Sequence, residues 1–435
     1  TQDYTDEFKR LLPFRLTGAQ NRAVSESISQ MTSGITMNRL LQGDVGSGKT
    51  AVAAALIYTV VKNGYQCAFM APTEILAQQH FITCQNFFKD TNIHAELLTG
   101  SVTAANKRAI KERLKSGETR LIIGTHALIQ DDVEFSALGL VITDEQHRFG
   151  VKHRAALSKK GDKPHTLVMS ATPIPRTLAL MLYGDLDVSV LDELPPGRQP
   201  IETYYVTGKL RARAFGYVKK HLDEGRQGYI VCPLVEEGDE DIAAAESYAE
   251  NLSKGFFNGY EVGLLHGKMK PKQKDEVMSR FVSGEVKLLI ATTVIEVGVD
   301  VPNAVIMVIE NAERFGLSQL HQLRGRVGRG NKKSFCLLLY SPNLSEVGKE
   351  RLSVIRSSTD GFEIAREDLR LRGPGEFMGA KQSGAPLLRF ADLNHDTELL
   401  EAARQASQSW LNTDPKSALL HARRWFAESG NFLQA

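Results

Sequence analysis

The stretch Gly43-Asp44-Val45-Gly46-Ser47-Gly48-Lys49-Thr50 decides the fold of this 435-residue chain. It matches the pattern G-x-x-x-x-G-K-[ST], in which a glycine-rich loop joins a strand to a helix and binds phosphate. Glycine lets backbone N–H groups turn toward the phosphates, and the amino end of the helix adds positive potential. A chance glycine-rich turn is the alternative, and the strand and helix patterns on either side argue against it.

This loop predicts a site for ATP and Mg²⁺. Lys49 is expected to reach the β- and γ-phosphates, and the Thr50 hydroxyl is expected to hold Mg²⁺. The other loop residues expected to contact the nucleotide are Gly43, Gly46, Ser47 and Gly48.

Outward from the loop, short apolar runs alternate with amphipathic stretches typical of helices. In the first half, strands are expected at residues 40–41, 66–71, 121–124, 140–143 and 166–169, with a helix at 50–62. In the second half, strands are expected at 229–233, 262–265, 288–291, 305–309 and 335–339, with helices at 242–254, 272–283 and 318–326. Such alternation predicts an α/β fold with parallel sheets covered by helices on both faces.

The proline-rich stretch at residues 194–200 interrupts the pattern and is interpreted as a linker between two domains. We predict a first domain at residues 1–197, a second at 198–342, and a C-terminal extension at 343–435. The extension is expected to contain helices and a glycine-rich loop at 372–384.

The composition narrows the class of protein but says little about its binding partners. The formal net charge is only +2, so contacts with nucleic acid would depend on local clusters. No apolar run reaches the about 18 residues that a transmembrane helix needs, and the polar start at residues 1–10 is no signal peptide. The widely spaced Cys67, Cys84, Cys232 and Cys336 are typical of buried thiols in a cytoplasmic protein.

An apolar run at residues 138–143 ends in the acidic pair Asp144-Glu145. A carboxylate at the carboxyl end of a neighbouring parallel strand can reach the phosphate site. Asp144 is therefore expected to hold Mg²⁺ through water, and Glu145 to orient and activate the attacking water. A lone Asp-Glu pair is usually a solvated turn, but with the phosphate loop it predicts an ATPase.

Residues 321–330, His-Gln-Leu-Arg-Gly-Arg-Val-Gly-Arg-Gly, form what we call the arginine segment. Phosphoryl transfer gains strongly from an arginine placed on the developing charge, and this arginine can come from another domain. Arg326 and Arg329 are the predicted catalytic arginines; they lie three apart, so a helix would present both on one side. A solvated basic face and contacts with DNA phosphates are the alternatives.

Within this segment, Gln322, Gly325, Arg326 and Arg329 resemble the superfamily 2 helicase pattern Q-x-x-G-R-x-x-R. Residues 71–76, 124–128, 170–173, 265–267 and 291–300 resemble the other motifs of that superfamily in the expected order. The resemblance implies two tandem RecA-like P-loop domains, with Gln322 and Asp300 also binding the nucleotide. It assigns coupling or DNA contact to Thr73, Thr125, His147, Ser170, Thr172, His266 and Thr292.

Residues 12–20, Leu-Pro-Phe-Arg-Leu-Thr-Gly-Ala-Gln, resemble the adenine-reading segment of the same superfamily. Gln20 has both the donor and the acceptor that pairing with the adenine edge requires. A helix start capped by Thr17 is the alternative interpretation, and both can hold.

Residues 144–150, 170–177 and 313–329 narrow the resemblance to the RecG family, and residues 367–376 with 382–384 resemble its translocation motif. That family consists of bacterial ATP-dependent DNA helicases that remodel stalled replication forks and Holliday junctions in recombination and DNA repair. The resemblance implies roles for Arg370, Arg372 and Gln382 in moving duplex DNA. It also implies forked or branched DNA and a single-strand DNA-binding protein as partners, a monomer, and a bacterial cytoplasmic, nucleoid-associated location.

The sequence is also compatible with three alternative functions. They are a duplex translocase of the transcription-repair coupling type, a nucleotide-gated DNA-binding module without turnover, and an RNA helicase. The coupling factor generally has D-E-E-Q-R-F-G where this chain has Asp-Glu-Gln-His-Arg-Phe-Gly at 144–150. RecG proteins also carry an amino-terminal wedge domain, for which residues 1–11 leave no room, so we expect a fragment with impaired junction specificity.

Overall fold

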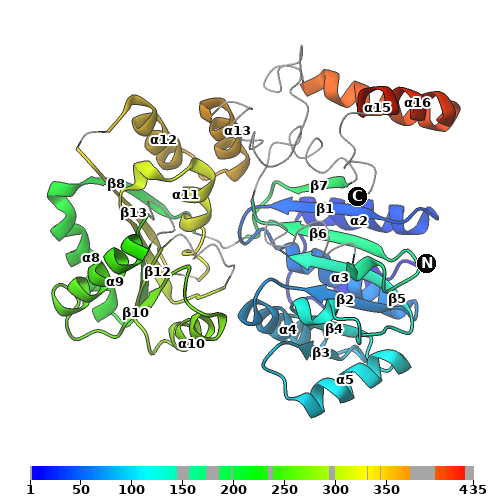
Figure 1. Cartoon of the computed structure of the whole chain (residues 1–435), viewed down its shortest axis with the longest axis horizontal. Coiled ribbons are helices and arrows are strands. Elements are labelled where there is room, and N and C mark those ends of the chain that lie inside the picture. The colour runs from blue at the N-terminus through cyan, green and yellow to red at the C-terminus, as the bar shows by residue number, and fades with distance from the viewer. Residues whose placement is uncertain are drawn as a thin grey trace.

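The computed structural model describes residues 2–144, 156–172, 186–196, 199–233, 239–292, 299–330, 332–342, 344–372 and 397–426 (Figure 1). Two separate parallel sheets lie side by side in it, each with its own helices. The predicted α/β architecture with two tandem parallel-sheet domains is thereby confirmed.

The first sheet has seven strands in the order β3-β4-β2-β5-β6-β1-β7. Every pairing in it is parallel. Its strands are β1 (Asn38–Gly43), β2 (Gln66–Met70), β3 (Ala95–Leu98), β4 (Leu121–Gly124), β5 (Leu138–Asp144), β6 (His165–Ser170) and β7 (Asp187–Leu191).

Helices cover both faces of this sheet, which is why its central strands β2 and β5 are buried along almost their whole length. In β2, for example, Cys67 and Phe69 join one buried cluster, whereas Ala68 and Met70 join the other. One face carries α1 (Thr5–Leu11), α2 (Gly18–Thr32), α3 (Lys49–Lys62) and α4 (Glu74–Phe88). The other carries α5 (Ala104–Ser116) and the 3-10 turn η1 (His126–Ile129).

The second sheet has six strands in the order β10-β11-β9-β12-β13-β8, again with parallel pairings only. Its strands are β8 (Glu202–Thr207), β9 (Gln227–Val231), β10 (Val262–Leu265), β11 (Leu288–Ala291), β12 (Ala304–Ile309) and β13 (Phe335–Tyr340). Its helices are α8 (Arg211–Asp223), α9 (Asp239–Lys254), α10 (Pro271–Val282) and α11 (Leu317–Arg324), with short turns η3 (Gly208–Leu210) and η5 (Ala312–Arg314).

Two helical pairs follow the second sheet. Helices α12 (Glu346–Ser357) and α13 (Gly361–Arg372) lie against the second domain, where Leu352, Ile355 and Ile364 belong to its buried core. Helices α15 (Thr397–Thr413) and α16 (Pro415–Phe426) pack on each other and leave apolar side chains such as Leu420 exposed. Among the described residues, no helix is both long enough and apolar enough to cross a membrane.

Two features differ from the expectations. The strands that the sequence did not indicate, β3, β7 and β8, all lie at sheet edges, where one side meets solvent and the apolar pattern weakens. The helix expected at residues 318–326 ends at Arg324.

The chain passes from the first sheet to the second between β7 and β8, within the region of the expected linker. The domain limits at 197 and 342 stay predictions.

Candidate nucleotide site between the two domains

The phosphate loop follows β1 and leads directly into α3. Gly46 and Gly48 both have a φ of +82°, a conformation that side chains disfavour. A Cβ on Gly48 would also lie 2.2 Å from the Gln20 amide nitrogen. Both observations explain why the local sequence is glycine-rich: the backbone must turn sharply while the neighbouring segment packs directly on it.

The lysine of the loop is buried and bonded to the loop itself. The Lys49 Nζ donates to the carbonyl oxygens of Gly43, at 2.8 Å, and Asp44, at 3.0 Å. Beside it, the Ser47 hydroxyl is buried without a hydrogen-bond partner among the described residues. A buried ammonium group, an unpaired hydroxyl and a glycine cradle fit a triphosphate, because phosphate oxygens accept hydrogen bonds from all three kinds of donor.

Gln20 holds this loop from α2. Its side-chain nitrogen donates to the Ser47 carbonyl at 2.8 Å, and its side-chain oxygen accepts from the Thr17 N–H at 2.9 Å. Thr17 in turn accepts from the Gln20 N–H, so the expected helix cap is present. Each amide group retains one further hydrogen-bonding position. Contact with adenine therefore stays a prediction.

Asp144 lies at the carboxyl end of β5, as expected for a Mg²⁺ carboxylate. Its Oδ2 lies 2.7 Å from the Nε2 of His80 on α4, and both side chains are nearly buried. Thr50 lies in the first turn of α3 and is partly exposed. No group of three metal-ligating His, Cys, Asp or Glu side chains occurs in the described ranges. Thr50 and Asp144 both supply oxygen atoms, the ligand type that Mg²⁺ prefers, and their binding of Mg²⁺ stays a prediction.

His80 was not expected from the sequence. It lies within the buried stripe of α4, with Leu76, Ala77, Cys84 and Phe88, so its helical position suggests an apolar contact rather than an ion pair. Its ring does lie against Phe69, with 4.4 Å between ring centroids. A polar residue inside an apolar stripe is the signal that could have indicated it.

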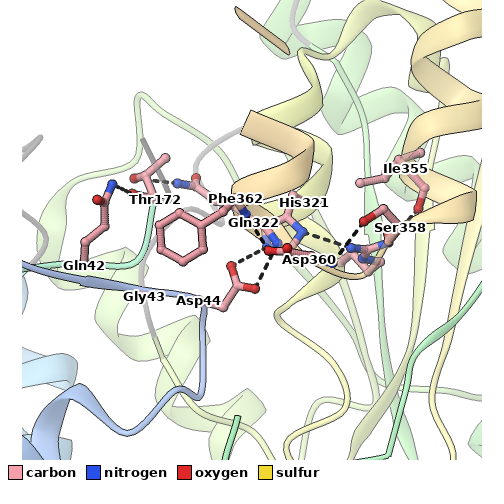
Figure 2. Close-up of polar contacts among 12 residues, drawn as sticks. Gln42, Gly43, Asp44, Thr172, His321, Gln322, Ile355, Ser358, Asp360 and Phe362 are labelled. Atoms are coloured by element: carbon pink, nitrogen blue, oxygen red, sulfur yellow. Dashed lines mark hydrogen bonds and ion pairs between the residues drawn. The ribbon is translucent and has the colours of Figure 1, made fainter. Parts of the chain in front are cut away.

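The arginine segment of the second domain touches the phosphate loop of the first (Figure 2). The His321 Nε2 lies 2.7 Å from Asp44 Oδ1, and the Gly361 N–H donates to Asp44 Oδ2 at 3.1 Å. Burial raises the pKa of Asp44, but the hydrogen bonds from His321 and Gly361 outweigh it, so the pKa lies below its ordinary value. The Asp44 carboxylate therefore joins three parts of the chain: the loop, α11 and α13.

A second polar contact joins the domains near Thr172. The Gln322 side chain donates to the Thr172 hydroxyl at 3.0 Å, and the Gln42 side chain donates to the Thr172 carbonyl at 3.0 Å (Figure 2). The Thr172 N–H also donates to Ser170 Oγ at 3.2 Å. Gln322, which was expected to bind the nucleotide, is therefore hydrogen-bonded to Thr172, which was expected to have a coupling role. Its contact with nucleotide stays a prediction.

The two predicted catalytic arginines, Arg326 and Arg329, do not share a helix, so the expectation of a common helical face was wrong. Helix α11 ends at Arg324, and the left-handed Gly328, with a φ of +78°, turns the chain between Arg326 and Arg329. Arg326 is buried, and Arg329 lies 3.6 Å from the Asp300 carboxylate. The segment nevertheless faces the phosphate loop, because a Cβ on Gly325 would contact Val45 at 3.3 Å.

The residues expected to contact DNA lie at several strand ends and loops. Thr73 caps α4, and His266 lies 3.6 Å from the Glu246 carboxylate. Thr125 follows β4 and Thr292 follows β11; both are buried, with hydroxyls that have no partner in the described ranges. Arg370 pairs with Glu350 and Glu367 on its helical hairpin. The predictions for Glu145, His147, Gln382 and the Arg372 side chain lie outside the described residues.

Three family profiles match the chain in succession. They are DEAD/DEAH box helicase at residues 19–181, helicase conserved C-terminal domain at 213–331, and the C-terminal part of domain 3 of the ATP-dependent DNA helicase RecG at 358–423. Together with the paired sheets, these matches identify the two-domain fold of the superfamily 2 helicases.

Curated relatives specify the family. The ATP-dependent DNA helicase RecG of Bacillus subtilis is 53% identical over 408 residues, covering 94% of this chain and 60% of the relative. That of Thermotoga maritima is 52% identical, covering 93% and 52%. Over the region that it spans, the chain belongs to the RecG family. It represents about half to three fifths of the length of these relatives.

Solved structures agree with this assignment. The structure of RecG bound to a three-way DNA junction is 49% identical, with a TM-score of 0.79, and the match covers 91% of this chain and 52% of that one. S. cerevisiae Dbp5 bound to RNA and ADP BeF3 is 18% identical, with a TM-score of 0.55 and coverage of 83% and 94%. That second likeness shows the fold alone.

Proposed function

We propose that this chain is the ATP-driven motor of a DNA helicase that remodels branched DNA. The observation that carries the proposal is the contact of the arginine segment with the phosphate loop, through His321 and Asp44. A second domain that touches the loop can respond when the loop binds phosphate. RecG relatives and the structure of RecG with a three-way junction support branched DNA as the substrate.

ATP with Mg²⁺ would supply the phosphoryl group and the free energy of the cycle. On the protein side, Lys49 would exchange its two loop carbonyls for phosphate oxygens, and Thr50 and Asp144 would hold Mg²⁺. Glu145 orients the attacking water, while Arg326 and Arg329 approach from the second domain to neutralise developing charge. We propose that Gln20, Gln322 and Asp300 complete the nucleotide contacts.

Movement along DNA would come from changes in the distance between the domains. Thr73, Thr125, Ser170 and Thr172 belong to the first domain, whereas His266 and Thr292 belong to the second. If each set holds a phosphate backbone, opening and closing shifts one set relative to the other. Arg370, Arg372 and Gln382 would act on the duplex through the hairpin that α12 and α13 form.

The experiment is phosphate release by this chain with forked, duplex and single-stranded DNA, and with RNA. We expect forked DNA to stimulate most and RNA least. The Lys49→Ala variant should lose turnover, whereas Lys89→Ala, an exposed lysine at the end of α4, should retain it. Turnover independent of any DNA, or equal stimulation by RNA, would contradict the proposal. A single-strand DNA-binding protein as partner, and a monomeric state, can be tested by sedimentation.

A further inference from the structure

Asp144 is held by a side chain that the nucleotide chemistry does not require. His80 Nε2 lies 2.7 Å from Asp144 Oδ2, and the two side chains are 9% and 11% exposed. Because a carboxylate accepts hydrogen bonds, His80 acts as the donor. Its ring is fixed in turn by Phe69, which is fully buried in β2. His80 therefore contributes to the orientation of the Asp144 carboxylate at the end of β5.

The residue next to His80 faces the second domain. The Gln79 side chain donates to the Asp300 carbonyl at 3.0 Å and accepts from the Asp300 N–H at 3.0 Å. Such a reciprocal amide pair fixes both distance and orientation. Ile75, one turn earlier, packs against the core of the second domain, and α10 packs against α4. Helix α4, which belongs to the first domain, therefore also contacts the second domain.

Asp300 leads on to a catalytic arginine. Its carboxylate lies 3.6 Å from Arg329 Nη1, while its backbone is bonded to Gln79. A displacement of the second domain that moves Arg329 and Asp300 would therefore also move the Gln79 side chain, through its hydrogen bonds to the Asp300 backbone. The adjacent His80 would carry this displacement to Asp144, because both residues belong to the same rigid helix.

The second domain contains the same arrangement at the corresponding place. In strand order, β8 to β13 occupy the positions of β1 to β6. Glu310 follows β12 as Asp144 ends β5, and Tyr248 lies on α9, the helix that corresponds to α4. The Tyr248 hydroxyl donates to Glu310 at 2.6 Å. The topology therefore places a donor from this helix on the carboxylate in both domains.

We propose that His80 is a positioning residue that orients the Asp144 carboxylate for Mg²⁺, and that Gln79 makes this orientation depend on the place of the second domain. The inference rests on the proposed function, since it assigns Mg²⁺ to Asp144. It adds a donor to the site and a route by which the distance between the domains reaches the metal carboxylate.

The first test compares two substitutions at one position. His80→Phe keeps the ring against Phe69 but removes the donor, whereas His80→Gln keeps an N–H donor. Binding of a fluorescent, non-hydrolysable ATP analogue is measured against Mg²⁺ concentration without DNA. We expect Phe to raise the half-saturating Mg²⁺ about 10-fold, as loss of groups that orient metal ligands typically does, and Gln to stay within about threefold.

Equal Mg²⁺ dependence in the wild type and His80→Phe would overturn the positioning role, as would equal losses in the Phe and Gln variants. Circular dichroism checks that each variant is folded, and His80→Leu replaces the Phe variant if the latter does not fold. Because this readout needs neither DNA nor turnover, it remains decisive even if stimulation by DNA, and with it the proposed function, fails.

The second test addresses the link to the second domain. Gln79→Ala removes the amide pair, and Gln78→Ala, an exposed neighbour on the same helix, is the matched control. We expect Gln79→Ala to lower the ratio of DNA-stimulated to basal phosphate release about fivefold, and Gln78→Ala to leave the ratio within about 1.5-fold. Equal ratios in the two variants would contradict the coupling role of Gln79.

Discussion

The six strands of the second sheet repeat the order of β1 to β6 in the first, but the two domains differ at the place where a nucleotide would bind. In the first domain, β1 leads into the glycine loop and Lys49, and Asp144 lies nearby at the end of β5. In the second, β8 leads into the short turn η3 and then α8. Glu310, at the end of the corresponding strand, is bonded to Arg211 at 2.9 Å and to Tyr248 at 2.6 Å.

A repeated fold can in this way hold a single nucleotide. The second domain keeps a carboxylate at the strand end, but protein side chains satisfy it, and Arg211 also stacks on Tyr248. Burial, together with Glu310, raises the pKa of Tyr248, so its hydroxyl stays protonated and remains a donor. We infer that the second domain acts on a nucleotide held by the first domain, through the arginine segment that faces the phosphate loop, and does not bind one at its own strand end.

The largest difference between the domains is expected when the corresponding lysines, Lys49 and Lys209, are replaced. Lys49→Ala removes the ammonium group that binds phosphate, and we expect phosphate release to fall about 1000-fold or more. Lys209→Ala changes an exposed lysine in η3, which occupies the place of the phosphate loop, and should change turnover less than about twofold. A large loss with Lys209→Ala would mean that the second domain also binds phosphate.

A smaller effect is expected at the contact between the domains. Asp44→Asn keeps the shape of the side chain but converts the charged hydrogen bonds from His321 and Gly361 into neutral ones. The loss of about 1–2 kcal/mol would shift the balance toward separated domains roughly 10-fold. Fluorescence energy transfer between dyes on α5 and α8 measures the separation, and an unchanged distribution would contradict a role for Asp44 in joining the domains.

Features formed by residues close together in the sequence could be predicted, whereas contacts between distant residues could not. The phosphate loop and the central strands are contiguous patterns, so both were predicted. The contacts of Asp44 with His321 and of Asp300 with Gln79 join residues 277 and 221 positions apart, and no local period encodes such pairings. The end of α11 was missed because the residues after it have helical spacing, whereas Gly325 and Gly328 end and turn the chain.

The smallest predicted effect concerns the stability of the second domain. Glu310→Gln removes the negative charge of the carboxylate that Arg211 and Tyr248 both contact. We expect the free energy of unfolding to fall by about 1–2 kcal/mol. The value is modest because the Arg211 side chain is 42% exposed and therefore partly screened. Thermal unfolding measures it, and binding of the ATP analogue should stay unchanged. Weaker nucleotide binding would place Glu310 in the nucleotide site.

The motor function depends on whether arginines of the second domain act on a nucleotide held by the first. Turnover and binding of the ATP analogue are measured for Arg326→Ala and Arg329→Ala, with the exposed Arg314→Ala as control. We expect turnover to fall about 1000-fold or more in the Arg326→Ala and Arg329→Ala variants, with affinity for the analogue within about fivefold of wild type. Unchanged turnover, or affinity that falls as far as turnover, would contradict this expectation.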